Sequence, residues 1–223
     1  PSIFHSAPEI VGTSLFGVFL NALSGTYAYV KQHRVYFKAA IPFAIATLPG
    51  AILGSLVSDY FTGPTFSLSY GIFILIISAI MYWNSSNKKA IATNFDETLF
   101  ITRKKLGIIL SMFVGFISSI FGIGGGIIHV PVMIYALAFP PHMATATSHF
   151  VLAVSSFMGV TSHIFLNHIV WIPALAVGFG AVIGAQIGAR LSKKTKPRSI
   201  ILLLCISLFL LGIRMIVESN LLF

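Results

Sequence analysis

Charged residues are scarce in this sequence, and acidic residues are the scarcest of them. Only 9% of the 223 residues are charged, and five Asp and Glu stand against fourteen Lys and Arg. Soluble domains carry about 25% charged residues, so this chain could not cover a surface exposed to water. With 57% hydrophobic residues and a mean hydropathy of +0.95, the composition indicates an integral membrane protein.

Cysteine is almost absent too. The single Cys205 lies inside an apolar run, which excludes an intramolecular disulfide and a thiol-rich metal site. No segment combines a nucleophile with a base, and the glycines from Gly122 lack the third glycine of a dinucleotide fingerprint. The sequence therefore predicts neither an enzyme nor a bound cofactor. The basic residues form short clusters between apolar runs, which is typical of membrane topology and argues against a nucleic-acid partner.

Six apolar runs are long enough to cross a bilayer core of roughly 30 Å as helices. They cover residues 10–30, 39–58, 66–83, 143–166, 171–191 and 199–217. The segment 106–139 is longer than one crossing requires, and glycines interrupt it at 122–126. The connections are short except for the polar stretch 84–105, which we expect to be a cytoplasmic loop. It divides the chain into a first repeat, 1–83, and a second repeat, 106–223.

Basic residues predict the orientation of these spans. All Lys and Arg except Arg214 fall in the clusters 31–38, 88–89, 103–105 and 190–198. Every cluster is cytoplasmic if 106–139 forms a hairpin that enters along 106–121, breaks at the glycines and returns along 127–139. A single crossing by this segment would place at least one strong basic cluster outside.

The two halves contain a weak internal repeat. Residues 13–58 align with 147–192 without a gap, and the nine identities include Thr13 with Thr147, Ser14 with Ser148 and Gly50 with Gly184. The predicted topology runs inward along 10–30 and outward along 143–166, so we expect inverted copies, a symmetry common in secondary transporters. The predicted fold is an all-α, polytopic, inverted-repeat bundle with helices broken at glycine-rich segments.

The repeat also predicts a segment ahead of the first copy. In the second copy a glycine-rich hairpin precedes the helix that carries Thr147 and Ser148, whereas only residues 1–8 precede the first copy. The repeat therefore predicts about 35–40 further residues of a matching hairpin. Either the chain is a fragment or its first half has lost this hairpin.

Hydroxyl, amide and glycine residues mark a candidate binding site. A helix that restarts after the glycines points its positive end and free amides at the break, where they can bind an anion. Side-chain hydroxyls and amides can donate to the oxygens of a ligand. The candidate substrate-binding residues are Thr13, Ser14, Asn21, Ser24, Gly124, Gly125, Gly126, Thr147, Ser148 and His149. Helix capping and close helix packing are the structural alternatives for them.

Histidines leave a second class of function open. His142 and His149 are seven residues apart and share a helix face, with Met133, Met143 and Met158 nearby as soft ligands for a metal permease. No carboxylate accompanies them, so we interpret His129 and His149 as hydrogen-bonding or proton-handling groups and predict no metal site. A channel and a non-transporting assembly or sensor protein, binding a partner through 84–105, also remain open.

The glycine-rich segment and the Thr-Ser pairs resemble a known family. The run Gly124-Gly-Gly126, Pro131, Pro141, Ala144 and Thr147-Ser148 resembles the characteristic segment of the TauE/SafE sulfite-exporter family. Gly12-Thr-Ser14, Asn21 to Gly25, Tyr29 and Pro49-Gly-Ala51 resemble its other repeat. The resemblance implies a multi-pass permease of the cytoplasmic membrane for sulfite, sulfonates or related organic anions, working by alternating access. Its partners would be the anion and the lipid bilayer, with a homo-oligomer left open. His149 departs from the family pattern, which implies an apolar residue there.

Overall fold

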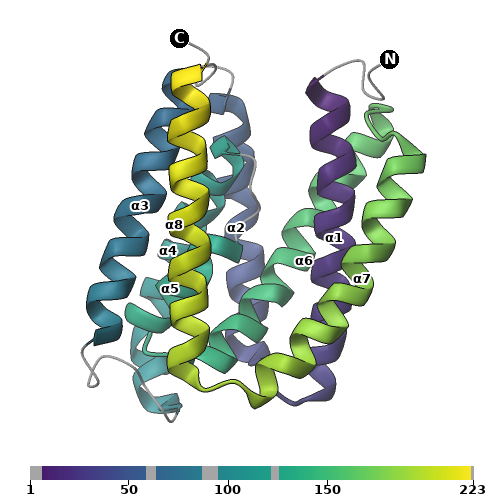
Figure 1. The fold of residues 1–223 in the computed structure, drawn as a ribbon. Coiled ribbons are helices and arrows are strands. Elements are labelled where there is room, and N and C mark those ends of the chain that lie inside the picture. Colours follow the sequence, from purple (N-terminus) through teal and green to yellow (C-terminus); the bar gives the residue numbers. More distant parts are fainter. Residues whose placement is uncertain (1–6, 59–63, 87–94, 122–125, 222–223) are drawn as a thin grey trace.

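The computed structural model describes residues 7–58, 64–86, 95–121 and 126–221, and these residues are almost entirely helical (Figure 1). Along them run eight helices: α1 (Ala7–Lys31), α2 (Phe37–Ser58), α3 (Pro64–Ser86), α4 (Glu97–Phe121), α5 (Gly126–Tyr135), α6 (Pro141–Phe165), α7 (Trp171–Lys194) and α8 (Pro197–Leu221). The predicted apolar runs fall on α1, α2, α3, α6, α7 and α8. The whole of α6 and α7 and most of α2 and α8 are long and apolar enough to span a membrane. The prediction of an all-α, polytopic membrane protein is confirmed.

Prolines set several helix boundaries. α3, α6 and α8 begin at Pro64, Pro141 and Pro197, where the missing N–H has no intrahelical partner to lose. Pro42 and Pro49 lie inside α2, where each removes one intrahelical hydrogen bond.

α4 begins earlier than the sequence predicts. It starts at Glu97 rather than 106, so the last part of the expected loop 84–105 is helical. Asp96 explains this start, because its carboxylate accepts hydrogen bonds from the backbone N–H groups of Thr98 and Leu99 at 2.9 and 3.1 Å. Residues 87–94 of the expected loop lie outside the described residues.

α4 and α5 run antiparallel to each other. Near the start of α4, Arg103 donates from Nη1 to the carbonyl of Ala136, just past the end of α5, at 2.9 Å. α5 has 10 residues. At 1.5 Å per residue it is about 15 Å long, half the thickness of a hydrocarbon core. α5 therefore starts near the middle of the predicted membrane span, and Gly122 to Gly125 lie outside the described residues.

α1 and α6 are also antiparallel, as the ribbon in Figure 1 shows. Gly25 of α1 lies against His149 of α6, and Leu15 lies against Gly159. α7 packs on α1, α4 on α2, and α8 on α3. The α1–α2 and α7–α8 connections and the start of α4 lie at the same end of the bundle (bottom in Figure 1). These segments carry the basic clusters 31–38, 190–198 and 103–105, so this end is the predicted cytoplasmic one.

Candidate functional site

The start of α5 lies inside the bundle, against α6. A Cβ added at Gly126 would lie 3.1 Å from Cδ2 of Leu152. The first backbone N–H groups of a helix have no intrahelical partner, and they form the positive end of its dipole. The short α5 therefore presents amides without an intrahelical partner at mid-depth, an arrangement suited to an anion. Gly124 and Gly125, predicted for the same site, lie outside the described residues.

Serines flank Leu152 on the face of α6 that meets α5. Ser148, Leu152 and Ser155 are four and three residues apart, so they share one face of the helix. Ser148 is buried, and its Oγ donates to the carbonyl of Thr145 at 3.2 Å. Ser155 donates in the same way to Leu152 at 3.1 Å. Such hydroxyls can rotate their protons from a helix carbonyl toward a ligand oxygen.

Ser118 of α4 is a candidate that the sequence analysis missed. Its Oγ is buried, and no group in the described part of the chain forms a hydrogen bond with it. Ser111 contacts His129, which is three residues into α5, so Ser118 lies about one turn beyond the level where α5 begins. An unpaired buried hydroxyl is unfavourable by about 1–3 kcal/mol, so this position favours water or a polar ligand. The only sequence signal was a polar residue shortly before the glycines.

His129 of α5 joins the two arms of the hairpin. Its Nε2 lies 2.9 Å from Oγ of Ser111, and Ser111 donates to the carbonyl of Gly107 at 2.7 Å. A hydroxyl has one proton, so Nε2 must be the donor to Ser111. His129 is fully buried, and its ring lies 5.9 Å from that of Phe43. These contacts give His129 a structural role, and proton handling by it stays a prediction.

Thr13 and Thr147 each hold the start of a helix from the other half. The Oγ1 of Thr147 accepts a hydrogen bond from the backbone N–H of Tyr36 at 3.2 Å. The Oγ1 of Thr13 accepts one from Val170 at 3.0 Å. Tyr36 and Val170 are separated by the same 134 positions as Thr13 and Thr147. We call two residues separated by this repeat offset counterparts.

Other contacts occur in counterpart pairs as well. The rings of Phe16 and Trp171 are 5.8 Å apart, and those of their counterparts Phe150 and Phe37 are 5.5 Å apart. The turns after α1 and α6 both contain a residue in the left-handed region, His33 with φ 54° and Asn167 with φ 56°. These pairs support the predicted inverted repeat.

The structure does not bring the two predicted threonines together. The contacts of Gly25 with His149 and of Leu15 with Gly159 set the register of α1 on α6. In this register Thr13 and Thr147 are separated by about 20 Å along the bundle, at 1.5 Å per residue. Ser14 beside Thr13 is exposed, whereas Asn21 is half-buried and close to the level of Leu152. Asn21 therefore lies at the depth of the α5 start, and the Thr13-Ser14 pair does not.

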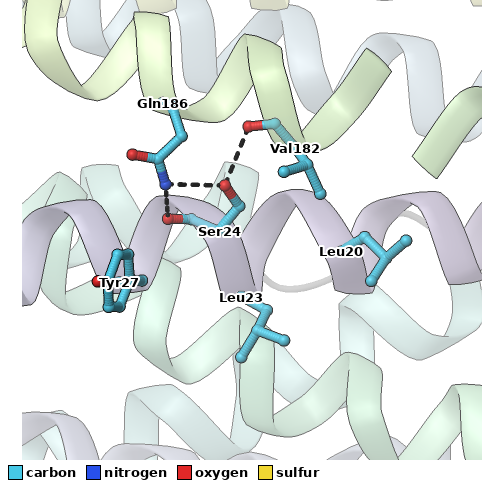
Figure 2. A pocket seen from close by; sticks show the side chains of 6 residues that line it. All are labelled: Leu20, Leu23, Ser24, Tyr27, Val182 and Gln186. Carbon is cyan, nitrogen blue, oxygen red and sulfur yellow. Dashed lines mark hydrogen bonds between the residues drawn. The ribbon is translucent and has the colours of Figure 1, made fainter. Parts of the chain in front are cut away.

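Ser24 lies in a separate groove between α1 and α7 (Figure 2). The groove has a volume of about 410 Å³. Ser24 donates from Oγ to the carbonyl of Val182 at 2.9 Å, and Nε2 of Gln186 donates to Oγ and the carbonyl of Ser24 at 2.9 and 2.8 Å. These bonds join α7 to α1, which favours a packing role for Ser24.

His149 connects the candidate site with a cationic cluster at the predicted cytoplasmic end. Its ring meets that of Tyr29 edge-on at 5.3 Å, and the guanidinium of Arg34 lies 5.0 Å above the Tyr29 ring. His149 is half-buried and Tyr29 is buried. Sequence reasoning assigned Arg34 only to membrane topology.

Arg34 forms hydrogen bonds within its own turn and to the neighbouring helices α6 and α7. Nη1 donates to Oε1 of Gln32 at 2.9 Å and to Oγ of Ser192 at 3.0 Å. Nη2 donates to Nδ1 and the carbonyl of His142 at 2.8 and 3.3 Å. Burial lowers the pKa of Arg34 from its ordinary value, yet arginine stays protonated at neutral pH. The cluster therefore places a fixed positive charge among neutral acceptors.

Residues 2–215 match the family model described as Sulfite exporter TauE/SafE. The chain belongs to the TauE/SafE family. This TauE/SafE chain is 35% identical over 224 residues to the probable membrane transporter protein YunE of Bacillus subtilis (strain 168), and the match covers 95% of this chain and 82% of that protein. It is 29% identical over 216 residues to the probable membrane transporter protein MJ0441 of Methanocaldococcus jannaschii, covering 92% and 78%. No solved structure matches.

The match to the family model and the similarity to these relatives confirm the family predicted from the sequence, and they indicate membrane transport. A multi-pass membrane protein is consistent with both the comparisons and the apolar helices. The names of these two relatives state no substrate.

Proposed function

We propose that this protein is a secondary transporter of the cytoplasmic membrane that moves a small anion by alternating access. The proposed substrate is sulfite, a sulfonate or a related organic anion. The observation that carries the proposal is the half-length helix α5, which begins at mid-depth against α6. Broken helices at this depth are a common feature of transporter sites.

The free energy of burying an ion limits how this site can work. Burying an isolated ion is unfavourable by tens of kcal/mol on Born estimates. A helix end contributes about 0.3–2 kcal/mol, so α5 alone cannot hold a bare anion. The site therefore needs further hydrogen-bond donors, water or a partly protonated anion. The buried hydroxyls of Ser118 on α4 and Ser148 on α6 are the donors that we assign to this site.

We assign the predicted residues to the centre or the ends of the transport path. Gly126, Ser148 and Asn21 belong to the central site, because they are at or next to the depth of the α5 start. Gly124 and Gly125 are assigned to it because they directly precede Gly126 in the sequence. Thr13 and Ser14 lie toward one end, where the anion would enter or leave. Thr147 is next to Ser148 in depth, but its hydroxyl is bonded to the start of α2. His149 would take up or release a proton beside the central site. Rocking of one repeat against the other would expose the centre to either side in turn.

A metal permease is less compatible with the observed contacts. Arg34 donates to Nδ1 of His142, which is the lone pair that a metal ion would need. A bound cation would also face the positive guanidinium at short range. Among the described residues, no group of three His, Cys, Asp or Glu is placed to bind a metal.

Ligand-induced stabilisation of the detergent-purified protein tests the proposed site. Sulfite or a sulfonate should raise the Tm as its concentration increases, because a ligand that binds only the folded state stabilises it. The double variant Ser118→Ala with Ser148→Ala should lose this shift. The control Ser162→Ala should keep it, because Ser162 is exposed and bonds its own helix at Met158. Equal shifts in all three proteins would contradict the site, and a shift with divalent metals alone would favour the metal permease.

A further inference from the structure

α2 and α7 are counterparts with unequal neighbours. In α2, 44% of the span Phe37–Gly54 is buried, whereas only 17% of the span in α7, Trp171–Lys194, is buried. α4 packs along α2, and the main neighbour of α7 among the described helices is α1. α4 therefore covers a face of α2 in the first repeat, whereas the equivalent face of α7 in the second repeat is exposed in the described structure.

Glycines show where this difference arises. Gly50 of α2 touches the backbone of Met112 in α4, and Gly115 of α4 touches the carbonyl of Thr47. The two helices thus meet through glycines on both sides, which is typical of close packing in membranes. The counterpart of Gly50 is Gly184, and a Cβ added there would have no atom of the described residues within 4 Å. The same holds for Gly180 and Gly188, one turn to either side.

We propose that the open face of α7, formed by Gly180, Gly184 and Gly188, binds a helical hairpin equivalent to α4–α5. A stripe of glycines alone would not identify an occupant. The covered counterpart α2 identifies it, because Gly50 lies directly against the backbone of Met112 in α4. The partner is a membrane helix with a small residue at the contact, in the position that α4 occupies on α2.

The order of elements indicates where this hairpin belongs in the polypeptide. α4 and α5 directly precede α6, and the counterpart of α6 is α1. The equivalent hairpin would therefore precede α1 in the same polypeptide. The match to YunE leaves about a fifth of that relative unmatched, which is close to the length of the segment from the start of α4 to the start of α6.

Site-specific photo-cross-linking of the protein expressed from the natural start codon of its gene tests this proposal. Benzoylphenylalanine replaces Val177, which is 55% exposed, whereas its counterpart Phe43 is 0% exposed beneath α4. The matched control carries the same group at Phe179, which is 71% exposed and has an exposed counterpart, Ile45 at 62%. We expect position 177 to cross-link to a peptide upstream of α1 and position 179 to form no protein adduct.

Three results would overturn the proposal. The first is a start codon immediately ahead of Pro1, which would leave no hairpin to bind. The second is a cross-link at position 177 that joins two copies of the chain, which would make the face a dimer interface. The third is the absence of a protein adduct at both positions, which would assign the face to lipid.

A stability measurement provides an independent test. In the protein made from the natural start codon, Gly184→Leu should lower the Tm by several degrees, and so should Gly50→Leu. In the 223-residue chain Gly184→Leu should not lower the Tm, because no atom of the described residues lies within 4 Å of an added Cβ. An unchanged Tm for Gly184→Leu in both proteins would contradict the proposal. Neither test depends on transport or on the identity of the substrate.

Discussion

The hydroxyl of Thr147 accepts a hydrogen bond from the backbone N–H of Tyr36 at 3.2 Å, and so joins α6 to the start of α2. The counterpart bond joins Thr13 to Val170 at 3.0 Å, between α1 and the start of α7. Each half of the chain thus fixes a helix start of the other half. Both threonines are buried, so these bonds are shielded from water.

Replacing either threonine by valine removes the acceptor and keeps the shape of the side chain. Thr147→Val and Thr13→Val should each lower the free energy of unfolding by about 1–3 kcal/mol, because a backbone N–H is left unpaired. Denaturant titration of the purified protein measures this loss. Thr161→Val is the control, since Thr161 bonds the carbonyl of Phe157 in its own helix. A loss in the control equal to that of Thr147→Val would contradict the assigned role.

Arg34→Lys should weaken the cluster at the predicted cytoplasmic end. A lysine ammonium cannot reproduce the planar arrangement that reaches Gln32, Ser192 and His142 together. Hydrogen bonds to charged groups contribute about 1.5–3 kcal/mol, so a loss within this range is expected on unfolding in detergent. Arg190→Lys, at an exposed position, should change stability little. Equal stability of the two variants would show that the contacts of Arg34 contribute nothing.

Ser111→Ala should destabilise the hairpin of α4 and α5. The variant leaves the buried Nε2–H of His129 without its acceptor, a loss of about 1–3 kcal/mol. In a double-mutant cycle, Ser111→Ala and His129→Leu should show a coupling energy of at least about 0.5 kcal/mol. Additive effects of the two substitutions would indicate that this hydrogen bond does not join the helices.

The ion pair of Lys38 and Glu97 predicts a weak dependence of stability on pH. Lys38 donates to the Glu97 carboxylate at 2.6 Å and Tyr36 donates at 3.0 Å, and these bonds hold the pKa of Glu97 below its ordinary value of 4.5. A lowered pKa in the folded state means that the stabilisation is complete above the unfolded pKa and fades as the pH falls through the folded pKa. Between pH 6 and about pH 3, the Tm should therefore fall more in the native protein than in Glu97→Gln. Parallel curves for the two proteins would contradict this contribution.

The sequence predicted the helices well because their signal is local. Apolar runs, short basic clusters and prolines such as Pro141 and Pro197 are each visible in a single window of residues. The start of α4 was misplaced because the charged residues from Glu97 to Lys105 read as a loop. The cap formed by Asp96 allows this polar stretch to begin a helix.

The candidate site was less predictable because it depends on how helices align with each other. Thr13 and Thr147 occupy equivalent positions in their repeats, and the antiparallel register of α1 and α6 places them at opposite ends. Ser118 is a candidate only because α4 packs beside α5 and buries its unpaired hydroxyl. Arg34 looked like an ordinary topology signal, since its contacts with His142 and Ser192 span more than a hundred residues of sequence.

Flux of labelled sulfite into proteoliposomes tests the central claim most directly. The account predicts saturable uptake that responds to an imposed pH gradient, competes with a sulfonate and falls at least tenfold in Ser118→Ala with Ser148→Ala. Ser162→Ala should transport at the native rate. The anion-transporter account would be contradicted by folded, reconstituted protein that takes up a divalent metal but moves neither sulfite nor a sulfonate under any gradient.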